Sequence, residues 1–331
     1  MLPEDGLQRA VGRYALPERP SSPQAARLAE ALRQVAGDSI QGIVFFGSHR
    51  SGASPGSFSA HDLFVVTTDY LSFYHALRRA GRLRRGPRLM AALNAWMPPN
   101  QLAFREEHEA GVLLAKCAVI SGSSLRRETS GRRRDHFCCG RLFQPTEILH
   151  AADGAARECL LSDLVSALRE TYGWVRPWLG ARFDVGDYCR TALQVSMAGE
   201  VRPEQGGRCE ALWEAERSEL EPAVSELLAQ LAAAGELAAE ADGVYTLRRR
   251  VGSLERARWR LYFARSKLRA TLRWVKHTVT FDGWLDYILR KVERHGGGEM
   301  ALGRWERRWP LLLLWPRLLR FLRDRRRKGG G

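Results

Sequence analysis

The sequence predicts an α+β fold in three parts: a mixed sheet domain over residues 1–150, a mainly helical domain over 151–250, and a basic helical extension over 251–331. Three observations support this division. Short runs of β-branched and aromatic residues, bounded by Gly, Ser and Pro, recur in the first 120 residues. Longer segments with helical spacing follow, and charge and tryptophan content change near residue 250. A chain of 331 residues also exceeds the usual size of a single core.

The first domain is predicted from alternating helix and strand patterns. Residues 23–36 have helical spacing, and Pro23 suits the first turn of a helix. Two buried strands are expected at 43–46 and 62–66, where the apolar runs are too short for helices. Two short helices and a hairpin around a charged turn complete the domain, at 71–80, 87–96, 101–105 and 112–120. These segments predict a small mixed α/β sheet.

The second domain is predicted to be winged-helix-like. Helical spacing covers residues 156–173, 185–198 and 209–233. Two short strand patterns at 235–237 and 243–248 then resemble the two strands of a wing. Such modules bind DNA or serve as scaffolding, and both alternatives remain open.

The ends and the cysteines indicate the compartment that we expect. Residues 1–5 are polar and acidic, without the apolar stretch of a secretory signal. The six cysteines form no Cys-x-x-Cys pair and lack the spacing of a zinc site. We therefore expect reduced thiols in a cytoplasmic protein.

Positive charge is concentrated at the end of the chain. Residues 248–328 contain 24 Lys and Arg against 7 Asp and Glu, whereas the whole chain has a net charge of +15. The same stretch holds six of the ten tryptophans. Arginine mixed with Trp and Leu suits an anionic bilayer surface, where indole rings lie at the boundary. Nucleic acid is the rival partner, because its phosphates also attract a basic surface.

Residues 309–323 favour the membrane over nucleic acid. Their uncharged run ends at Pro316, far short of the ~20 residues that span a bilayer, and arginines then recur beside leucines. The prediction is a peripheral protein on the inner, cytoplasmic membrane face, with nucleic acid not expected as a partner. The alternative is that this segment packs on the protein's own core.

A candidate nucleotide site lies between the first two predicted strands. One strand ends in Gly47 and Ser48, and the next begins with Asp62. Gly47 allows the backbone to approach a phosphate, and Ser48 adds a hydroxyl and an amide donor. Asp62 offers a hard oxygen ligand for magnesium, although Phe64 occupies the position where many nucleotidyltransferases carry a second carboxylate. The alternative is a plain strand–turn–strand with a surface aspartate.

Further motifs extend this candidate site. They are Lys116–Ser121, Cys139–Pro145 and Ser196–Arg202. Together with Gly47–Ser48 and Asp62, they resemble in order and spacing a bacterial-like member of the mitochondrial-type phosphatidate cytidylyltransferase family, also called the mitochondrial translocator assembly and maintenance family. The resemblance covers roughly residues 40–225 and includes the absence of a carboxylate at Phe64.

The resemblance implies a nucleotidyltransferase-like sheet domain and a reaction. CTP and phosphatidic acid give CDP-diacylglycerol and pyrophosphate, with a divalent metal, for which we expect Mg²⁺. Lys116 would neutralise charge on the phosphates, and Arg141 with Arg202 would bind the lipid phosphate or the leaving pyrophosphate.

The expected metal ligands and nucleotide contacts follow from the same motifs. Asp62 would hold the metal, helped by Asp69, and Glu200 is either a further ligand or the partner of Arg202. The triphosphate contacts would come from Gly47, Ser48 and Arg202.

Two rival functions remain open at this point. One is a nucleotidyltransferase acting on RNA or protein, in which the winged helix and the basic end hold the macromolecule. The other is a non-catalytic nucleic-acid or membrane-binding adaptor that has lost a metal ligand.

Overall fold

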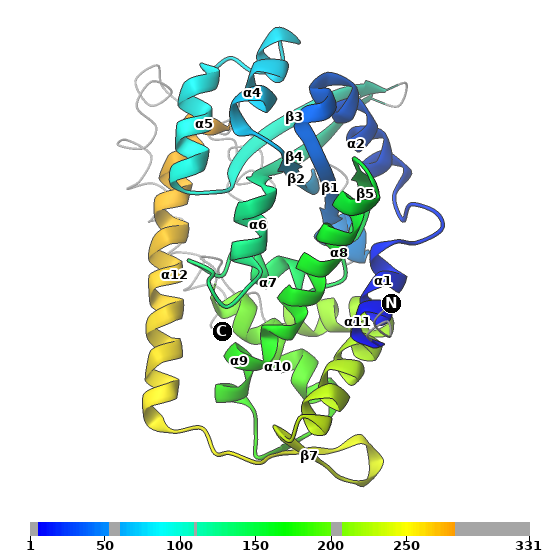
Figure 1. Ribbon diagram of the computed structural model, residues 1–331, viewed down its shortest axis with the longest axis vertical. Coiled ribbons are helices and arrows are strands. Elements are labelled where there is room, and N and C mark those ends of the chain that lie inside the picture. Colours follow the sequence, from blue (N-terminus) through cyan, green and yellow to red (C-terminus); the bar gives the residue numbers. More distant parts are fainter. Residues whose placement is uncertain (1–5, 53–59, 109–110, 200–206, 282–331) are drawn as a thin grey trace, which may run out of the picture.

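The structure is a computed structural model that describes residues 6–52, 60–108, 111–199 and 207–281 (Figure 1). Within these residues the central element is a five-stranded mixed sheet in the order β3-β4-β2-β1-β5. β2 and β4 run parallel, and the other neighbouring pairs are antiparallel. The strands are β1 (Ile40–Phe46), β2 (His61–Thr67), β3 (Asn100–His108), β4 (Gly111–Ser121) and β5 (Glu147–Ala151). The predicted mixed α/β architecture is therefore confirmed.

Both faces of the sheet are buried, because successive side chains of each strand point into different cores. Ile43 and Phe45 of β1 belong to one core, and Val44 and Phe46 belong to the other. Figure 1 shows α4 and α5 beyond one face and α8 beyond the other. The helices of the first core are α2 (Pro23–Ala36), α4 (Tyr70–Arg79) and α5 (Pro87–Trp96).

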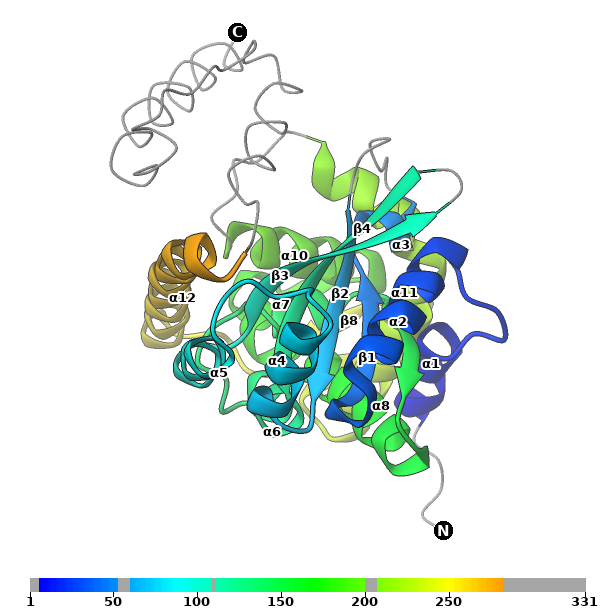
Figure 2. The same cartoon turned by 90° about the horizontal axis from the view of Figure 1, so that it is seen from above.

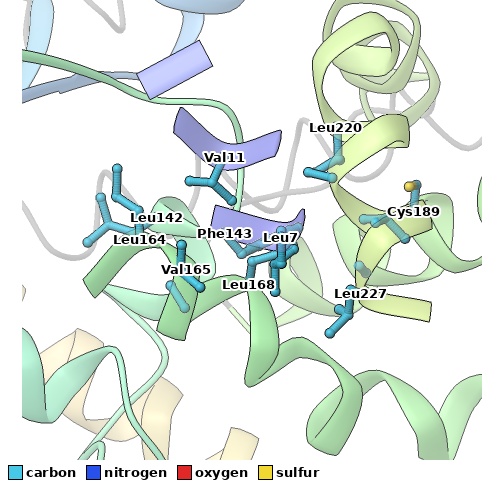
Figure 3. Packing of buried hydrophobic residues seen from close by; sticks show 14 of the residues in the cluster. Leu7, Val11, Leu142, Phe143, Leu164, Val165, Leu168, Cys189, Leu220 and Leu227 are labelled. Carbon is cyan, nitrogen blue, oxygen red and sulfur yellow. The ribbon is translucent and has the colours of Figure 1, made fainter. Parts of the chain in front are cut away.

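The second core joins the sheet to the helical half of the chain. Figure 3 shows Leu7 and Val11 of the first helix packed among leucines from residues 142 to 227. The core therefore runs across the domain boundary predicted at residue 150, and the domain division itself stays a prediction. Besides the long helix α12 (Ser253–Thr280), which contributes Phe263, its helices are α1 (Gly6–Ala15), α6 (Gly122–Glu128), α7 (Cys139–Leu142), α8 (Gly154–Arg169), α9 (Thr171–Val175), α10 (Val185–Ala198) and α11 (Arg208–Ala233).

A second, smaller sheet lies at the far end of the helical half (Figure 1). In the described residues it has three strands in the order β6-β8-β7. β6 precedes α10, and the β7–β8 hairpin follows α11. β8 lies in the middle of the sheet and pairs with both β6 and β7. The strands are β6 (Arg182–Phe183), β7 (Leu237–Ala239) and β8 (Tyr245–Leu247).

The long helix α12 (Ser253–Thr280) runs along one side of the molecule (Figure 1). Figure 2 shows it next to α5 and the β3 edge of the sheet. Its inner face buries Phe263 and Ser266 but also Arg273 and Lys276. Among the described helices, none combines the length and the apolar composition needed to cross a bilayer. The predicted membrane segment 309–323 lies outside the described residues.

Most predicted elements of the described residues are present. The helices predicted at 23–36, 87–96 and 185–198 have the predicted bounds. The single helix predicted over 156–173 is divided, because α8 ends at Arg169 and α9 begins at Thr171. The sequence patterns did not predict α1, β5 or β6. β5 is a partly exposed edge strand in which Glu147 and His150 interrupt the apolar residues, so it lacks the apolar run that marked β1 and β2.

Candidate functional site

The turn after β1 brings the backbone against Asp62. Gly47 has φ +85° and ψ −167°, and its carbonyl accepts hydrogen bonds from the Arg50 and Ser51 amides, at 2.9 and 3.1 Å, as α3 (Ser48–Ser51) begins. A Cβ atom on Gly47 would lie 2.8 Å from Asp62 Oδ2. Both the positive φ and this contact require glycine at the position. Ser48 follows as the first residue of α3 and is half-buried.

Asp62 is held between two neighbouring strands. In the sheet register it pairs with Phe46 of β1 on one side and with Lys116 of β4 on the other. Lys116 Nζ lies 3.9 Å from Asp62 Oδ1, and the two side chains keep 23% and 30% of their surface exposed. The predicted residues Gly47, Asp62 and Lys116 are therefore brought together from three separate elements.

Phe64, two residues beyond Asp62, lies on the same face of β2. Its ring is fully buried in the second core and packs 4.7 Å from the Phe46 ring. A carboxylate here would be buried in apolar surroundings, so the aromatic residue suits the position. Asp62 is then the carboxylate that faces Lys116 at this end of β2.

Asp69 is not part of this site, which corrects the prediction that it helps Asp62 hold a metal. It follows the opposite end of β2, which ends at Thr67, so most of the length of the strand separates the two carboxylates, about 20 Å. Asp69 is instead the N-cap of α4, where its side chain accepts a 2.7 Å hydrogen bond from the Ser72 amide. The capping role also lowers the pKa of Asp69.

Arg50 ties the turn to α11. Its guanidinium makes a bidentate pair with Glu219, at 2.5 and 2.8 Å, and only 8% of its side chain is exposed. Glu216, one helical turn earlier, is buried, and burial raises its pKa to about 8 while Arg50 opposes the shift. Tyr14 of α1 is buried in the same group. This set of residues was not predicted, because Arg50 and Glu219 are 169 residues apart.

Two histidines stack beside the turn. The rings of His49 and His61 lie 4.2 Å apart and nearly parallel. His61 is buried, and burial followed by the neighbouring His49 lowers its pKa. Since His61 immediately precedes Asp62 on the strand, it faces the other side of the sheet. We therefore assign the pair no direct part beside Asp62.

Arg141 lies on the same side of the sheet as Asp62 but farther along. Its Nη1 donates a 2.9 Å hydrogen bond to the Phe137 carbonyl, and its guanidinium lies 3.9 Å from the centre of the Phe137 ring. Phe137 in turn meets Phe64 edge-on at 6.1 Å. The predicted residues Glu200 and Arg202 lie outside the described residues.

A group of cations on α12 was not predicted from the sequence. Arg269 and Arg273 both pair with Asp135, and Arg273 also lies 4.7 Å from the centre of the Phe137 ring. Lys276 donates to the carbonyls of Met97 and Pro99. These residues come from the basic stretch 248–328, for which arginine mixed with Trp and Leu indicated an anionic bilayer surface. Composition alone could not show which of its cations turn inward.

Comparison with models of known protein families and with curated protein sequences found no match to this chain.

Proposed function

We propose that this protein is a CTP:phosphatidate cytidylyltransferase, which transfers CMP from CTP to phosphatidic acid and releases pyrophosphate. The single observation that carries the proposal is the convergence of Gly47, Asp62 and Lys116 at one end of the sheet. This combination joins a close backbone turn, a carboxylate and an ammonium group, which are the groups that a nucleoside triphosphate with its metal requires. The motif resemblance over residues 40–225 adds the substrate class.

The chemistry needs positioning more than proton transfer. A phosphate oxygen of phosphatidic acid attacks the α-phosphorus of CTP, a new P–O bond forms, and the bond to pyrophosphate breaks. The nucleophile is already an anionic oxygen, so little general-base help is needed. The turn at Gly47 and Ser48 would hold the triphosphate through backbone amides, and Lys116 would neutralise its charge.

Asp62 fits the role of a magnesium ligand. Mg²⁺ is usually held by one or two carboxylates together with substrate phosphates, and it keeps several waters. The Asp62 side chain is 30% exposed and lies against the turn that would hold those phosphates. When bound, the metal would neutralise charge on the phosphates. Among the residues that the structure describes, no group of three or more His, Cys, Asp or Glu is placed to hold a metal ion, so the phosphates would have to complete the set.

Two further predictions belong to this proposal. The order β6, α10, α11, β7, β8, with the last strand between the other two, supports a winged-helix-like arrangement. We assign it a scaffolding role, because α11 supplies Glu219 to the turn beside the nucleotide site. The basic segment 309–323 would hold the protein on an anionic membrane surface, where its lipid substrate lies.

Pyrophosphate release tests the proposal and its main rival together. The purified full chain would be supplied with Mg²⁺, one of the four ribonucleoside triphosphates, and vesicles with or without phosphatidic acid. We expect release only with CTP and only with phosphatidic acid. Release with RNA or a protein acceptor in place of the lipid would support the macromolecular nucleotidyltransferase instead. No release with any pair of substrates would favour the adaptor.

A further inference from the structure

Helix α5 exposes apolar side chains next to arginines. Leu89 and Trp96 are seven residues apart, so they share one side of the helix, and the two residues are 50% and 60% exposed. Arg88 is exposed in the first turn, and Arg84 is exposed just before the helix begins. We call Arg84, Arg88, Leu89 and Trp96 the α5 surface. Figure 2 shows α5 between α4 and α12, at the outer edge of the molecule.

The opposite side of α5 is fixed to the sheet, which determines the direction that the α5 surface faces. Met90 and Asn94 are fully buried on that side. Asn94 donates a 2.8 Å hydrogen bond to Tyr74 Oη, and its Oδ1 accepts a 3.1 Å hydrogen bond from the Asn100 amide. Breaking these bonds would leave buried polar groups unpaired, so the helix cannot rotate to bury its exposed side.

The α5 surface belongs to a stretch without acidic residues. Between Asp69 and Glu106 the sequence has seven arginines and no Asp or Glu. The neighbouring helix α12 has a single acidic residue, Glu255, and that residue pairs with Arg176. This side of the molecule therefore complements a partner that carries negative charge.

Helix α12 has the same composition beside the α5 surface. Lys276 donates to the carbonyls of Met97 and Pro99, so the last turns of α12 lie against the residues that follow α5. These turns also expose four large apolar residues, Leu268, Leu272, Trp274 and Val275. Exposed Leu, Val and Trp among arginines favour a partner that offers an apolar environment as well as negative charge.

We propose that the α5 surface lies on an anionic phospholipid bilayer. Arg84 and Arg88 would meet lipid phosphates, Trp96 would lie at the boundary, and Leu89 would enter the acyl region. This inference deepens the proposed function and rests on it, because the bilayer is where the lipid substrate lies. The surface is small, so we assign it the orientation of the folded body, and the main attachment stays with segment 309–323.

Other occupants fit the α5 surface less well. A nucleic acid would meet the arginines but would leave Leu89 in water. A second copy of the chain would bring two positively charged surfaces together. Residues 282–331 contain 13 Lys and Arg against 6 Asp and Glu, so their net charge of +7 opposes docking on the same arginines. The bilayer supplies both negative charge and an apolar layer.

Vesicle binding by the full chain tests the α5 surface. Wild type and variants would be co-sedimented, without CTP, with vesicles of phosphatidylcholine and phosphatidylglycerol, which contain no phosphatidic acid. The double variant Arg84→Gln/Arg88→Gln should bind about 30-fold more weakly, because each cation near an anionic surface contributes about fivefold. The matched control Arg27→Gln/Arg157→Gln removes two exposed arginines, from α2 and α8, and should bind like wild type.

Two apolar variants test contact with the acyl region. Leu89→Gln and Trp96→Gln should each weaken binding by about fivefold, because about half of each residue remains to be buried. This loss should persist at high salt, since salt screens arginines but not apolar contacts. Leu16→Gln is the control, because it replaces another partly exposed leucine, after α1. If one set of variants unfolds, the other set still decides the outcome.

Three results would overturn the proposal. The first is equal vesicle binding by wild type, the arginine variant and the apolar variants. The second is binding of RNA or DNA that the arginine variant loses while its vesicle binding is unchanged. The third is a dimer in solution that Leu89→Gln and Trp96→Gln dissociate without any change in vesicle binding.

Activity with two forms of the acceptor distinguishes failure of this inference from failure of the proposed function. The variants should need more vesicles for half-maximal CDP-diacylglycerol formation, but should match wild type with dihexanoyl phosphatidic acid dissolved as monomers. If neither acceptor gives product and the variants still lose vesicle binding, the proposed function fails and the α5 surface stands. If wild type and variants bind vesicles equally and form product from them equally, only the inference is wrong.

Discussion

A buried carboxyl group lies near the turn between β1 and α3. Glu216 is almost fully buried, and its Oε2 has no hydrogen-bond partner among the described residues. Arg50 of α3 lies close enough to Glu216 to oppose the rise in its pKa, but the bidentate pair of Arg50 is with Glu219. A neutral Glu216 leaves the Arg50–Glu219 pair balanced, whereas an ionised Glu216 would add a buried negative charge beside the pair. The position of Arg50, and with it α3, is therefore sensitive to one proton.

Glu216 should make the stability of the protein depend on pH. Because its pKa rises from 4.5 to about 8 on folding, the folded state holds a proton that the unfolded chain releases. This contribution to stability is complete below pH 4.5 and is lost as pH rises through about 8, with a slope of at most about 1.4 kcal/mol per pH unit. The unfolding free energy of wild type should therefore fall relative to Glu216→Gln between pH 5 and 8.

Urea unfolding of both proteins at several pH values measures this difference. Wild type and Glu216→Gln both contain Asp163, whose pKa burial raises to about 7. Asp163 therefore contributes equally to both stability curves and does not affect their difference. Parallel curves would show that Glu216 is ionised in the folded protein.

The residues predicted from sequence fall into two groups, for a physical reason. Gly47, Asp62 and Lys116 belong to strands and to the turn at a strand end, and the sheet register brings them together. Asp69 was placed with them because the motif resemblance implied it, but it follows the far end of β2, and the extended strand separates it from Asp62. Arg273 could not be predicted, because its position depends on how α12 packs against Asp135 and β3.

At the scale of elements, the β1–α3 turn is the most constrained connection of the candidate site. Two glycines with positive φ flank α3, Gly47 at +85° before it and Gly52 at +70° after it. They differ in surroundings, because a Cβ on Gly47 would meet Asp62, whereas a Cβ on Gly52 would meet nothing within 4 Å. Gly52 is therefore the reference for a glycine at positive φ that makes no such contact.

Gly47→Ala should impair cytidylyl transfer far more than Gly52→Ala. Gly52→Ala places a Cβ in the left-handed helical region, at a cost of about 1–2 kcal/mol in stability. Gly47, with ψ −167°, has a backbone conformation that is essentially confined to glycine, so an alanine there costs roughly 1–3 kcal/mol. Only the alanine at 47 also displaces the turn or Asp62, and a shift of about 1 Å at a reacting centre costs roughly 100-fold in rate. Thermal unfolding and kcat/KM for CTP measure the two effects. Similar losses of kcat/KM in both variants would mean that strain alone is responsible.

Elements with strong local patterns were predictable, and those defined by distant contacts were not. β1 and β2 are runs of apolar residues, so they were expected from the sequence. β6 has only two residues and exists because Phe183 pairs with Tyr245 of β8. α12 was expected as part of a basic helical extension, and within the described residues it is a helix, but its inner face of cations was not expected.

At the scale of the whole molecule, sheet and helices form a continuous body. The second core contains Phe64 of the sheet, Leu7 of α1 and Leu227 of α11, so the N-terminal helix lies among helices that come much later in sequence. The turn between β1 and α3 is consequently supported by both halves of the chain, through β1 and through α11. We therefore do not expect residues 1–150 alone to retain a stable site.

Deleting residues 304–331 should release the protein from membranes without unfolding it. The deleted part contains Trp309 to Arg323, where each cation near an anionic surface contributes about 1 kcal/mol and buried Leu and Trp add an apolar contribution. Co-sedimentation with anionic vesicles measures binding, and CTP affinity checks the nucleotide site. Truncated protein that still sediments like the full chain, or that unfolds, would show that the segment belongs to the core.

The most direct test follows the label of CTP carrying ³²P in its α-phosphate. The full chain would be incubated with Mg²⁺ and phosphatidic acid vesicles, and lipid products would be separated by thin-layer chromatography. Wild type should place the label in CDP-diacylglycerol. Asp62→Asn should lose at least ~100-fold of this activity while remaining folded, because the carboxylate charge beside the turn is removed. Asp69→Asn should retain it, because asparagine also caps a helix. Unlabelled lipid with wild type, or equal activity of Asp62→Asn and wild type, would contradict the account.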